Sequence, residues 1–149
     1  AFYCDGAAAG ELADLTLTGV YRADQVLADG PFSLAFQGGE DMGRTVPLSM
    51  NLEAEDGAVT LTQLRLSGLG LVLNFQGSSL GGADVLKDSS PVLHFRDGST
   101  LEARFDSGMG GEDSFALSFV PRDGEGARIF FDPGQVTHIS YQGVELLLT

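Results

Sequence analysis

The fold is decided by a nine-residue stretch, VPLSMNLEA, at residues 46–54. Apolar side chains stand at every even position of this stretch, and at the odd positions stand Pro47, Ser49, Asn51 and Glu53. An alternation with a period of two is typical of a β-strand that has one buried face and one exposed face. The stretch therefore predicts a strand of an antiparallel sheet with a single apolar side.

The same alternation recurs along the chain, and no window carries helical spacing over three turns. It appears at residues 69–75, 101–105 and 115–119. Inward positions of this pattern hold most of the phenylalanines, which predicts that they form the core: Phe32, Phe36, Phe75, Phe105, Phe115 and Phe119. Turn residues separate the strands at spacings of roughly 8–12 residues. The sequence thus predicts an all-β fold, an immunoglobulin-like antiparallel β-sandwich of about nine or ten strands.

Local signals place the turns and one irregularity. Asp97-Gly98 and Gln142-Gly143 each lie between two apolar alternations and predict hairpins. The alternation changes phase between residues 58 and 66, which predicts a β-bulge near Thr62-Gln63. Pro47 predicts an edge strand, because proline donates no hydrogen bond to a neighbouring strand. Further turns are expected at residues 29–31, 56–57 and 81–82.

The length of 149 residues corresponds to one domain. We expect a flexible linker at residues 1–11 and a single β-sandwich domain at residues 12–149. The net charge of -13 argues against nucleic acid and against an anionic membrane surface, since both require positive charge on the protein. No apolar run in the sequence approaches the ~18 residues of a membrane-spanning helix.

The longest loops are expected at residues 38–45, 77–90 and 106–113, and candidate chemistry concentrates in three groups of acidic residues. Loop carboxylates can bind calcium, and paired carboxylates can hydrolyse glycosides, but a calcium-loop spacing is missing. A solvated acidic rim is the alternative interpretation. The acidic groups are Glu53, Glu55 and Asp56; Asp106, Glu112 and Asp113; and Asp123 and Glu125.

The nucleophiles and nitrogen ligands are few. His94 and His138 are interpreted as isolated strand residues, with His138 on the same face as Val136 and Ser140. Cys4, the single cysteine, is interpreted as a bystander, with lipid modification as a second idea. The nucleophile elbow G-x-S-x-G and a phosphate-binding glycine loop are both missing from the sequence. We therefore assign no catalytic, cofactor-binding or metal-binding residue and expect a protein that is not an enzyme and uses no cofactor.

An ordered set of motifs resembles one family of extracellular domains. The first is GPFSLAF at residues 30–36, similar to a strand pattern G-x-W/F-x-F-x-F. LTQLRLS at residues 61–67 and LVLNF at residues 71–75 follow, and then the hairpin LHFRDGS at residues 93–99. The ending FDPGQVTHISYQG at residues 131–143 resembles the pattern F-D-P-x-x-V-x-x-I-x-(Y/I)-x-G. Together these motifs resemble the immunoglobulin-like C-terminal ectodomain of DUF4179-type proteins of Gram-positive bacteria.

The resemblance implies a location and a role. It implies a β domain outside the cell, held by a membrane anchor upstream of residue 1. We accordingly expect a non-enzymatic, signal-sensing or regulatory ectodomain of an envelope protein, similar to those of anti-sigma factors, with a protein or cell-wall ligand as partner. The alternative is a secreted or cell-surface binding module for a glycan, calcium or protein. An exposed sheet edge would also accept a partner strand by β-augmentation.

Overall fold

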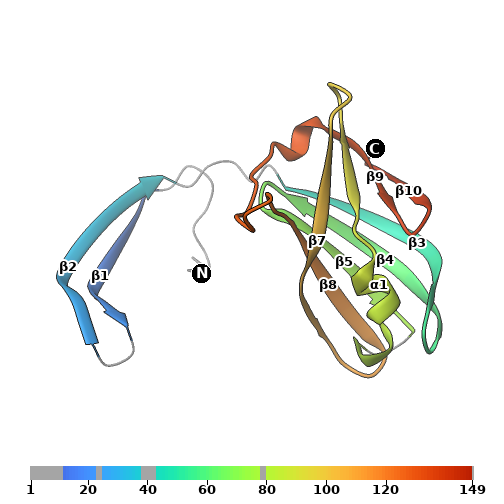
Figure 1. Cartoon of the computed structure of the whole chain (residues 1–149), viewed down its shortest axis with the longest axis horizontal. Helices are drawn as coiled ribbons and strands as arrows, with labels where there is room; N and C mark the ends of the chain where they lie inside the picture. The colour runs from blue at the N-terminus through green and yellow to red at the C-terminus, as the bar shows by residue number, and fades with distance from the viewer. Residues whose placement is uncertain (1–11, 23–24, 38–42, 78–79, 149) are drawn as a thin grey trace. The chain divides into compact units, whose positions relative to one another are not determined.

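Strands account for most of the structure (Figure 1). The computed structural model describes residues 12–22, 25–37, 43–77 and 80–148. The strands are β1 (Leu12–Arg22), β2 (Gln25–Gln37), β3 (Arg44–Ala54), β4 (Gly57–Ser67), β5 (Gly70–Gln76), β6 (Val92–Phe95), β7 (Thr100–Gly110), β8 (Ser114–Pro121), β9 (Val136–Tyr141) and β10 (Val144–Leu147). The described helices are η1 (Leu80–Gly82), α1 (Asp84–Asp88) and η2 (Pro133–Gln135). The predicted all-β class is confirmed.

The chain divides into two compact units, Ala1–Asp41 and Met42–Thr149. The first contains the antiparallel pair β1–β2, and the second contains the other eight strands. The predicted boundaries, a linker at residues 1–11 and one domain at residues 12–149, stay a prediction, and the linker lies outside the described residues. Within the described residues, no helix is long and apolar enough to span a bilayer.

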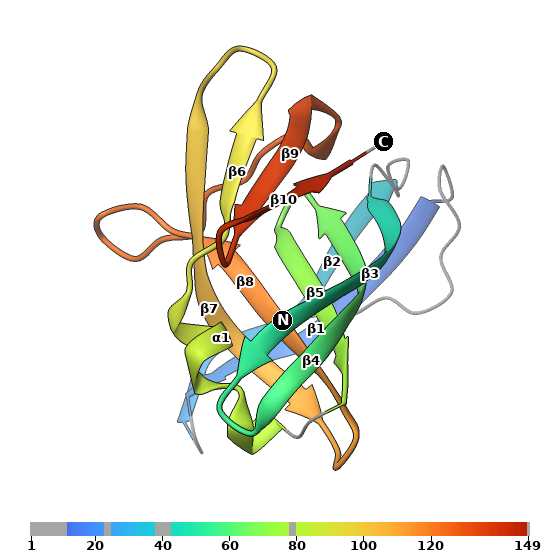
Figure 2. The same cartoon turned by 90° about the vertical axis from the view of Figure 1, so that its right-hand side faces the viewer.

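In the larger unit, eight strands form one continuous antiparallel sheet in the order β10-β9-β6-β7-β8-β5-β4-β3. The sheet curls, so that β3 and β10 approach the same side of the unit (Figure 2). These eight strands form one continuous hydrogen-bonded sheet, whereas a sandwich has two separate sheets that face each other. The predicted immunoglobulin-like sandwich and its strand count are therefore not confirmed.

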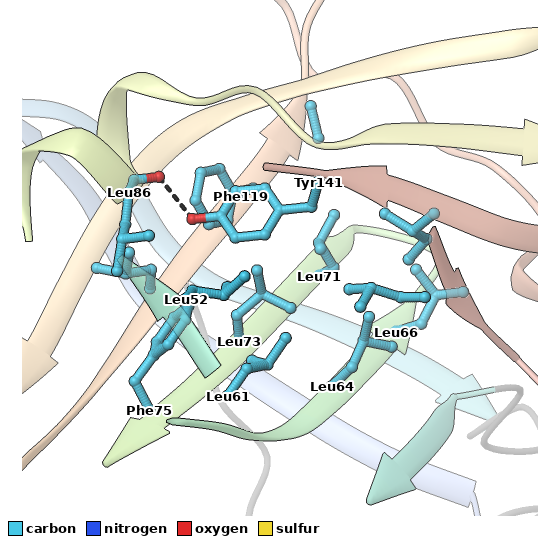
Figure 3. Close-up of a cluster of buried hydrophobic side chains, with 14 of the residues drawn as sticks. Leu52, Leu61, Leu64, Leu66, Leu71, Leu73, Phe75, Leu86, Phe119 and Tyr141 are labelled. Carbon is cyan, nitrogen blue, oxygen red and sulfur yellow. Dashed lines mark hydrogen bonds between the residues drawn. The ribbon is translucent and has the colours of Figure 1, made fainter. Parts of the chain in front are cut away.

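The core lies inside the curl (Figure 3). It is built from the inward alternation positions of β4, β5 and β8, together with side chains from β9, β10 and α1. Phe75 stacks on Phe115 at a ring separation of 4.9 Å, and Phe119 meets Tyr141 edge to face at 5.8 Å. The alternation predicted at residues 46–54 is confirmed, because the even positions of β3 face the core and the odd positions are exposed.

Several local predictions are also confirmed. The register between β4 and β5 skips Thr62, between the pairs Leu61–Phe75 and Gln63–Asn74, so the bulge lies where the phase change predicted it. Pro47 lies on β3, which forms one edge of the sheet. The hairpins at residues 97–98 and 142–143 join β6 to β7 and β9 to β10.

Other predictions are wrong. Residues 29–31 do not form a turn but lie within β2, where the two-stranded pairing leaves a proline tolerable. Leu69 lies exposed in the β4–β5 turn, and Phe105 is 38% exposed beside a register shift of β7. The supposed loop at residues 106–113 is mostly strand, because Gly110 lets β7 pass close to Phe115. The loop at residues 77–90 contains η1 and α1, which are too short for sequence periodicity to reveal.

The two edges of the sheet, β3 and β10, do not pair with each other in the described part of the chain. Side chains and one helix close this seam instead. Near its start, β3 carries Arg44, whose guanidinium donates to the carbonyl oxygens of Val136, at 2.9 Å, and of Leu148. At the opposite end of β3, the amide of Glu55 donates to the carbonyl of Gly82, and α1 follows directly. The hydroxyl of Tyr141 donates to the carbonyl of Leu86 in α1 at 2.7 Å (Figure 3).

Candidate functional site

The outer surface of β3, β4, β5 and β8 carries two adjacent rows of uncharged side chains. The register places Asn51, Thr60, Gln76 and Ser114 in one row, and Gln63, Asn74 and Ala116 in the next, with Thr62 at the bulge between them. We call these eight residues the amide–hydroxyl face. Its lack of charge is notable in a chain of net charge -13, since acidic residues would be expected on any exposed sheet surface.

Side chains of this face hydrogen-bond to one another across the strands. Thr60 Oγ1 donates to Asn51 Oδ1 at 3.0 Å, and Asn74 Nδ2 donates to Gln63 Oε1 at 3.2 Å. The Thr62 hydroxyl donates to the carbonyl oxygen of Asn74 at 3.1 Å, which secures the bulge. These bonds fix the orientation of the amides before any ligand arrives, and pre-arranged polar groups bind at a lower entropic cost.

A groove of about 470 Å³ lies at the β7–β8 end of this face. Its volume is in the range of pockets that hold small ligands. Met109 forms one wall and is 77% exposed, an unusual position for a long apolar side chain. The polar side chains of the groove are neutral. The groove is lined by Thr62, Asn74, Phe75, Gln76, Met109, Gly110, Ser114, Phe115 and Ala116.

The two histidines meet on another part of the sheet. His94 of β6 lies directly opposite His138 of β9, and their rings stack at 4.2 Å with an interplanar angle of 11°. The expectation that they are isolated is wrong, because the 43 residues between them return β9 to the side of β6. The prediction that His138 shares a face with Val136 and Ser140 is confirmed for Ser140 only. Ser140 faces outward with His138, whereas Val136 is buried after a register shift.

The acidic groups do not come together. Within the described ranges, no three histidine, cysteine or acidic side chains are arranged to hold a metal ion. The carboxylate of Asp123 accepts the amides of Glu125 and Ala127, each at 2.9 Å, and so closes its own loop. Asp106 is separated from Glu112 by the extended β7.

Asp106 instead forms an ion-pair cluster with two arginines. Its carboxylate lies 2.6 Å from Arg122 Nη2 and 3.5 Å from Arg128 Nη2. Arg122 also donates to the carbonyl of Gly126. The cluster ties the loop after β8 to β7, which is a structural role for one of the predicted acidic residues.

Among the described residues, two groups have shifted pKa values, and both shifts have structural causes. Burial raises the pKa of the Tyr141 phenol above its ordinary value. The hydroxyl and then the amide of Ser99 donate to the Asp97 carboxylate and lower its pKa. The first group closes the seam and the second closes the β6–β7 hairpin, so neither shift marks a reactive site.

Comparison with known proteins adds no relative: no family model, curated protein or solved structure matches the chain. Cys4 lies outside the described residues.

Sequence reasoning missed both the amide–hydroxyl face and the histidine pair. The polar residues of the face were visible as the outward half of each alternation, but only the register shows that they form a continuous surface. The pairing of His94 with His138 had no local signal at all.

Proposed function

We propose that this chain is a non-enzymatic binding domain on the outside of a bacterial cell, part of a membrane-anchored envelope protein with a sensing or regulatory role. The single observation that supports binding is the uncharged groove on the amide–hydroxyl face of an otherwise acidic protein. The resemblance of residues 30–148 to DUF4179-type ectodomains supports the cellular location. The two lines of support are independent of each other.

The chemistry of the groove favours a neutral, hydroxyl-rich ligand. Amide and hydroxyl groups such as those of Gln76 and Ser114 donate and accept hydrogen bonds without the desolvation penalty of a charge. Exposed Met109 provides an adaptable apolar contact beside them. A neutral cell-wall glycan or a polar peptide has the matching groups.

The second candidate is a secreted or cell-surface binding module without a regulatory role, for a glycan, calcium or protein. The same amide–hydroxyl face favours its glycan form. The two candidates differ in what precedes residue 1. A segment of about 20 apolar residues preceded by a small cytoplasmic region supports the envelope sensor, and a cleavable signal peptide alone supports the free module. A hydrolase domain upstream would contradict the envelope sensor.

Binding itself is tested with matched charge-introducing variants. We expect a neutral cell-wall oligosaccharide from a defined panel to raise the melting temperature, because a ligand that binds only the folded state stabilises it. Gln76→Glu places a carboxylate in the groove and should abolish that rise. Gln135→Glu makes the same change at an exposed residue of η2, outside the groove, and should leave it intact.

The contradicting outcomes are equally definite. A melting temperature indifferent to the whole panel and to calcium would reject the binding role. Equal loss of binding in Gln76→Glu and Gln135→Glu would show that the groove is not the ligand-binding site. Sequencing the coding DNA upstream of Ala1 tests the envelope location separately from either result.

A further inference from the structure

The stacked histidines of β6 and β9 place two imidazoles side by side on neighbouring strands. His94 and His138 are direct cross-strand partners, and both are partly exposed on the outer surface. We propose that they form a binding site for one divalent transition-metal ion, of the Zn²⁺ or Cu²⁺ class. This proposal does not depend on the proposed function.

The register of the two histidines places both imidazoles within reach of one ion. Metal–nitrogen bonds to histidine are about 2.0–2.1 Å long, so two imidazole nitrogens on one ion lie roughly 3–4 Å apart. The ring centroids are 4.2 Å apart and nearly parallel, so the lone pairs, which lie in the ring planes, converge on one ion only after the two partly exposed rings rotate about their side-chain torsions. Because direct cross-strand neighbours are held by the sheet, the strands keep the two rings together at little further entropic cost.

The hydrogen bonds around His138 leave its Nε2 as the nitrogen without a hydrogen. A threonine hydroxyl has a single hydrogen, and that of Thr137 is donated to the carbonyl oxygen of His94 at 3.1 Å. The 3.0 Å contact between Thr137 Oγ1 and His138 Nδ1 is then a bond in which Nδ1–H donates. Neutral His138 therefore carries its lone pair on Nε2. Metal-bound histidines show this arrangement, in which the second ring nitrogen donates to an oxygen that fixes the tautomer.

His94 presents a nitrogen beside a movable hydroxyl. Its Nε2 lies 2.8 Å from Ser140 Oγ, and a serine hydroxyl can rotate away or hydrogen-bond to a water on the ion. Ser140 is also the register partner of Val92, the outward residue that precedes His94 by two positions on β6. The candidate ligand nitrogen of His94 is thus accompanied by one hydroxyl on the same face.

The charges near the pair favour a cation overall. Val92 and Ser140 form the cross-strand row next to the two histidines. Exposed Glu102 on β7 is the register partner of Val92, and exposed Glu145 on β10 is the register partner of Ser140, so a carboxylate lies at each end of this row. Arg104 lies 3.6 Å from Glu102 and offsets part of its charge, and exposed Arg96 follows His94 by two residues. The net charge of -13 raises the local concentration of cations. With two protein ligands, the ion keeps positions open for water or for a bound partner.

The test uses Cu²⁺ as the probe, because two-imidazole sites bind it most tightly among the divalent ions of this series. The chain is prepared without a histidine tag and with Cys4→Ser, so that His94 and His138 are its only strongly metal-binding side chains. We expect one Cu²⁺ per chain by calorimetric titration and an electron paramagnetic resonance spectrum of two equivalent imidazole nitrogens. Zn²⁺ should compete for the site and raise the melting temperature.

Three substitutions and one control variant identify the site. His94→Ala and His138→Ala should each weaken Cu²⁺ binding at least about a hundredfold, since the second bond is effectively intramolecular. Thr137→Val leaves both ligands in place but removes the oxygen that fixes the tautomer, and should weaken binding roughly tenfold. Thr100→Val makes the same change on β7, opposite His94, and should have no effect, because its hydroxyl makes no bond to either ring within the described structure.

Circular dichroism confirms folding of each variant before titration. Binding that survives in His138→Ala, or a spectrum with a single imidazole, would overturn the site. Equal binding by Thr137→Val and Thr100→Val would overturn the positioning role of Thr137. A pair that binds no Cu²⁺ at all would be a plain stacking contact of two aromatic rings.

Discussion

The two ends of the seam between β3 and β10 are closed in different ways. At one end, a single long side chain, Arg44, reaches across and donates to two backbone carbonyls. At the other end, the short helix α1 fills the gap with the buried side chain of Leu86. The backbone carbonyl of Leu86 accepts a hydrogen bond from the Tyr141 hydroxyl. The first closure depends on charge-assisted hydrogen bonds and the second on burial. The two ends should therefore respond differently to substitution and to pH.

The largest effect is expected at the α1 end. Leu86→Ala removes a fully buried side chain and leaves a cavity, which should lower the free energy of unfolding by about 2–5 kcal/mol. Urea denaturation followed by circular dichroism measures the change. Val85→Ala is the control, because Val85 on the same helix is 45% exposed and should cost at most about 0.5 kcal/mol. Similar losses in the two variants would mean that α1 does not close the core.

The Arg44 end should respond more weakly but still clearly. Arg44→Ala removes two charge-assisted hydrogen bonds and should lower the free energy of unfolding by about 2 kcal/mol. This value is smaller than the sum of two such bonds because the guanidinium is partly exposed. Arg44→Lys keeps the charge but has no planar fork to reach both carbonyls, so it should recover less than half of the loss.

The control for this end is Arg65→Ala on the neighbouring strand β4. Arg65 is exposed, and its side chain makes no hydrogen bond or ion pair within the described residues. We expect a change within about 0.5 kcal/mol, measured by the same denaturation. Equal effects at Arg44 and Arg65 would show that charge alone, and not the bridging of the seam, stabilises the sheet.

The seam also shows what could be read from the sequence. Alternation at residues 46–54 predicted β3, Pro47 predicted its place at an edge, and a phase change predicted the Thr62 bulge, since each depends on neighbouring residues. Arg44 meets residues about 90 to 100 positions away, and His94 meets a residue 44 positions away. Such contacts depend on strand order and register, which no local pattern encodes. For the same reason the outward residues of four strands gave no sign that they form one amide–hydroxyl face.

The smallest effect, and the most specific, concerns the Tyr141 hydroxyl. Tyr141→Phe leaves the ring packed against Phe119 but leaves the carbonyl of Leu86 without its partner. The free energy of unfolding should fall by about 1–2 kcal/mol below pH 9. Denaturation curves over a range of pH give both this loss and its pH dependence.

The pH dependence separates this hydroxyl from every other contact at the seam. Burial raises the folded-state pKa of Tyr141 above its unfolded value of about 10, so its contribution is fully present below pH 10 and declines as the pH rises further. Above pH 10, the wild-type chain should lose about 1.4 kcal/mol per pH unit more than Tyr141→Phe, and the stability gap between them should close. All other titrating groups are common to both proteins and cancel in the comparison. Parallel pH profiles would place the Tyr141 phenol in solvent and remove its bond to α1 from the closure of the seam.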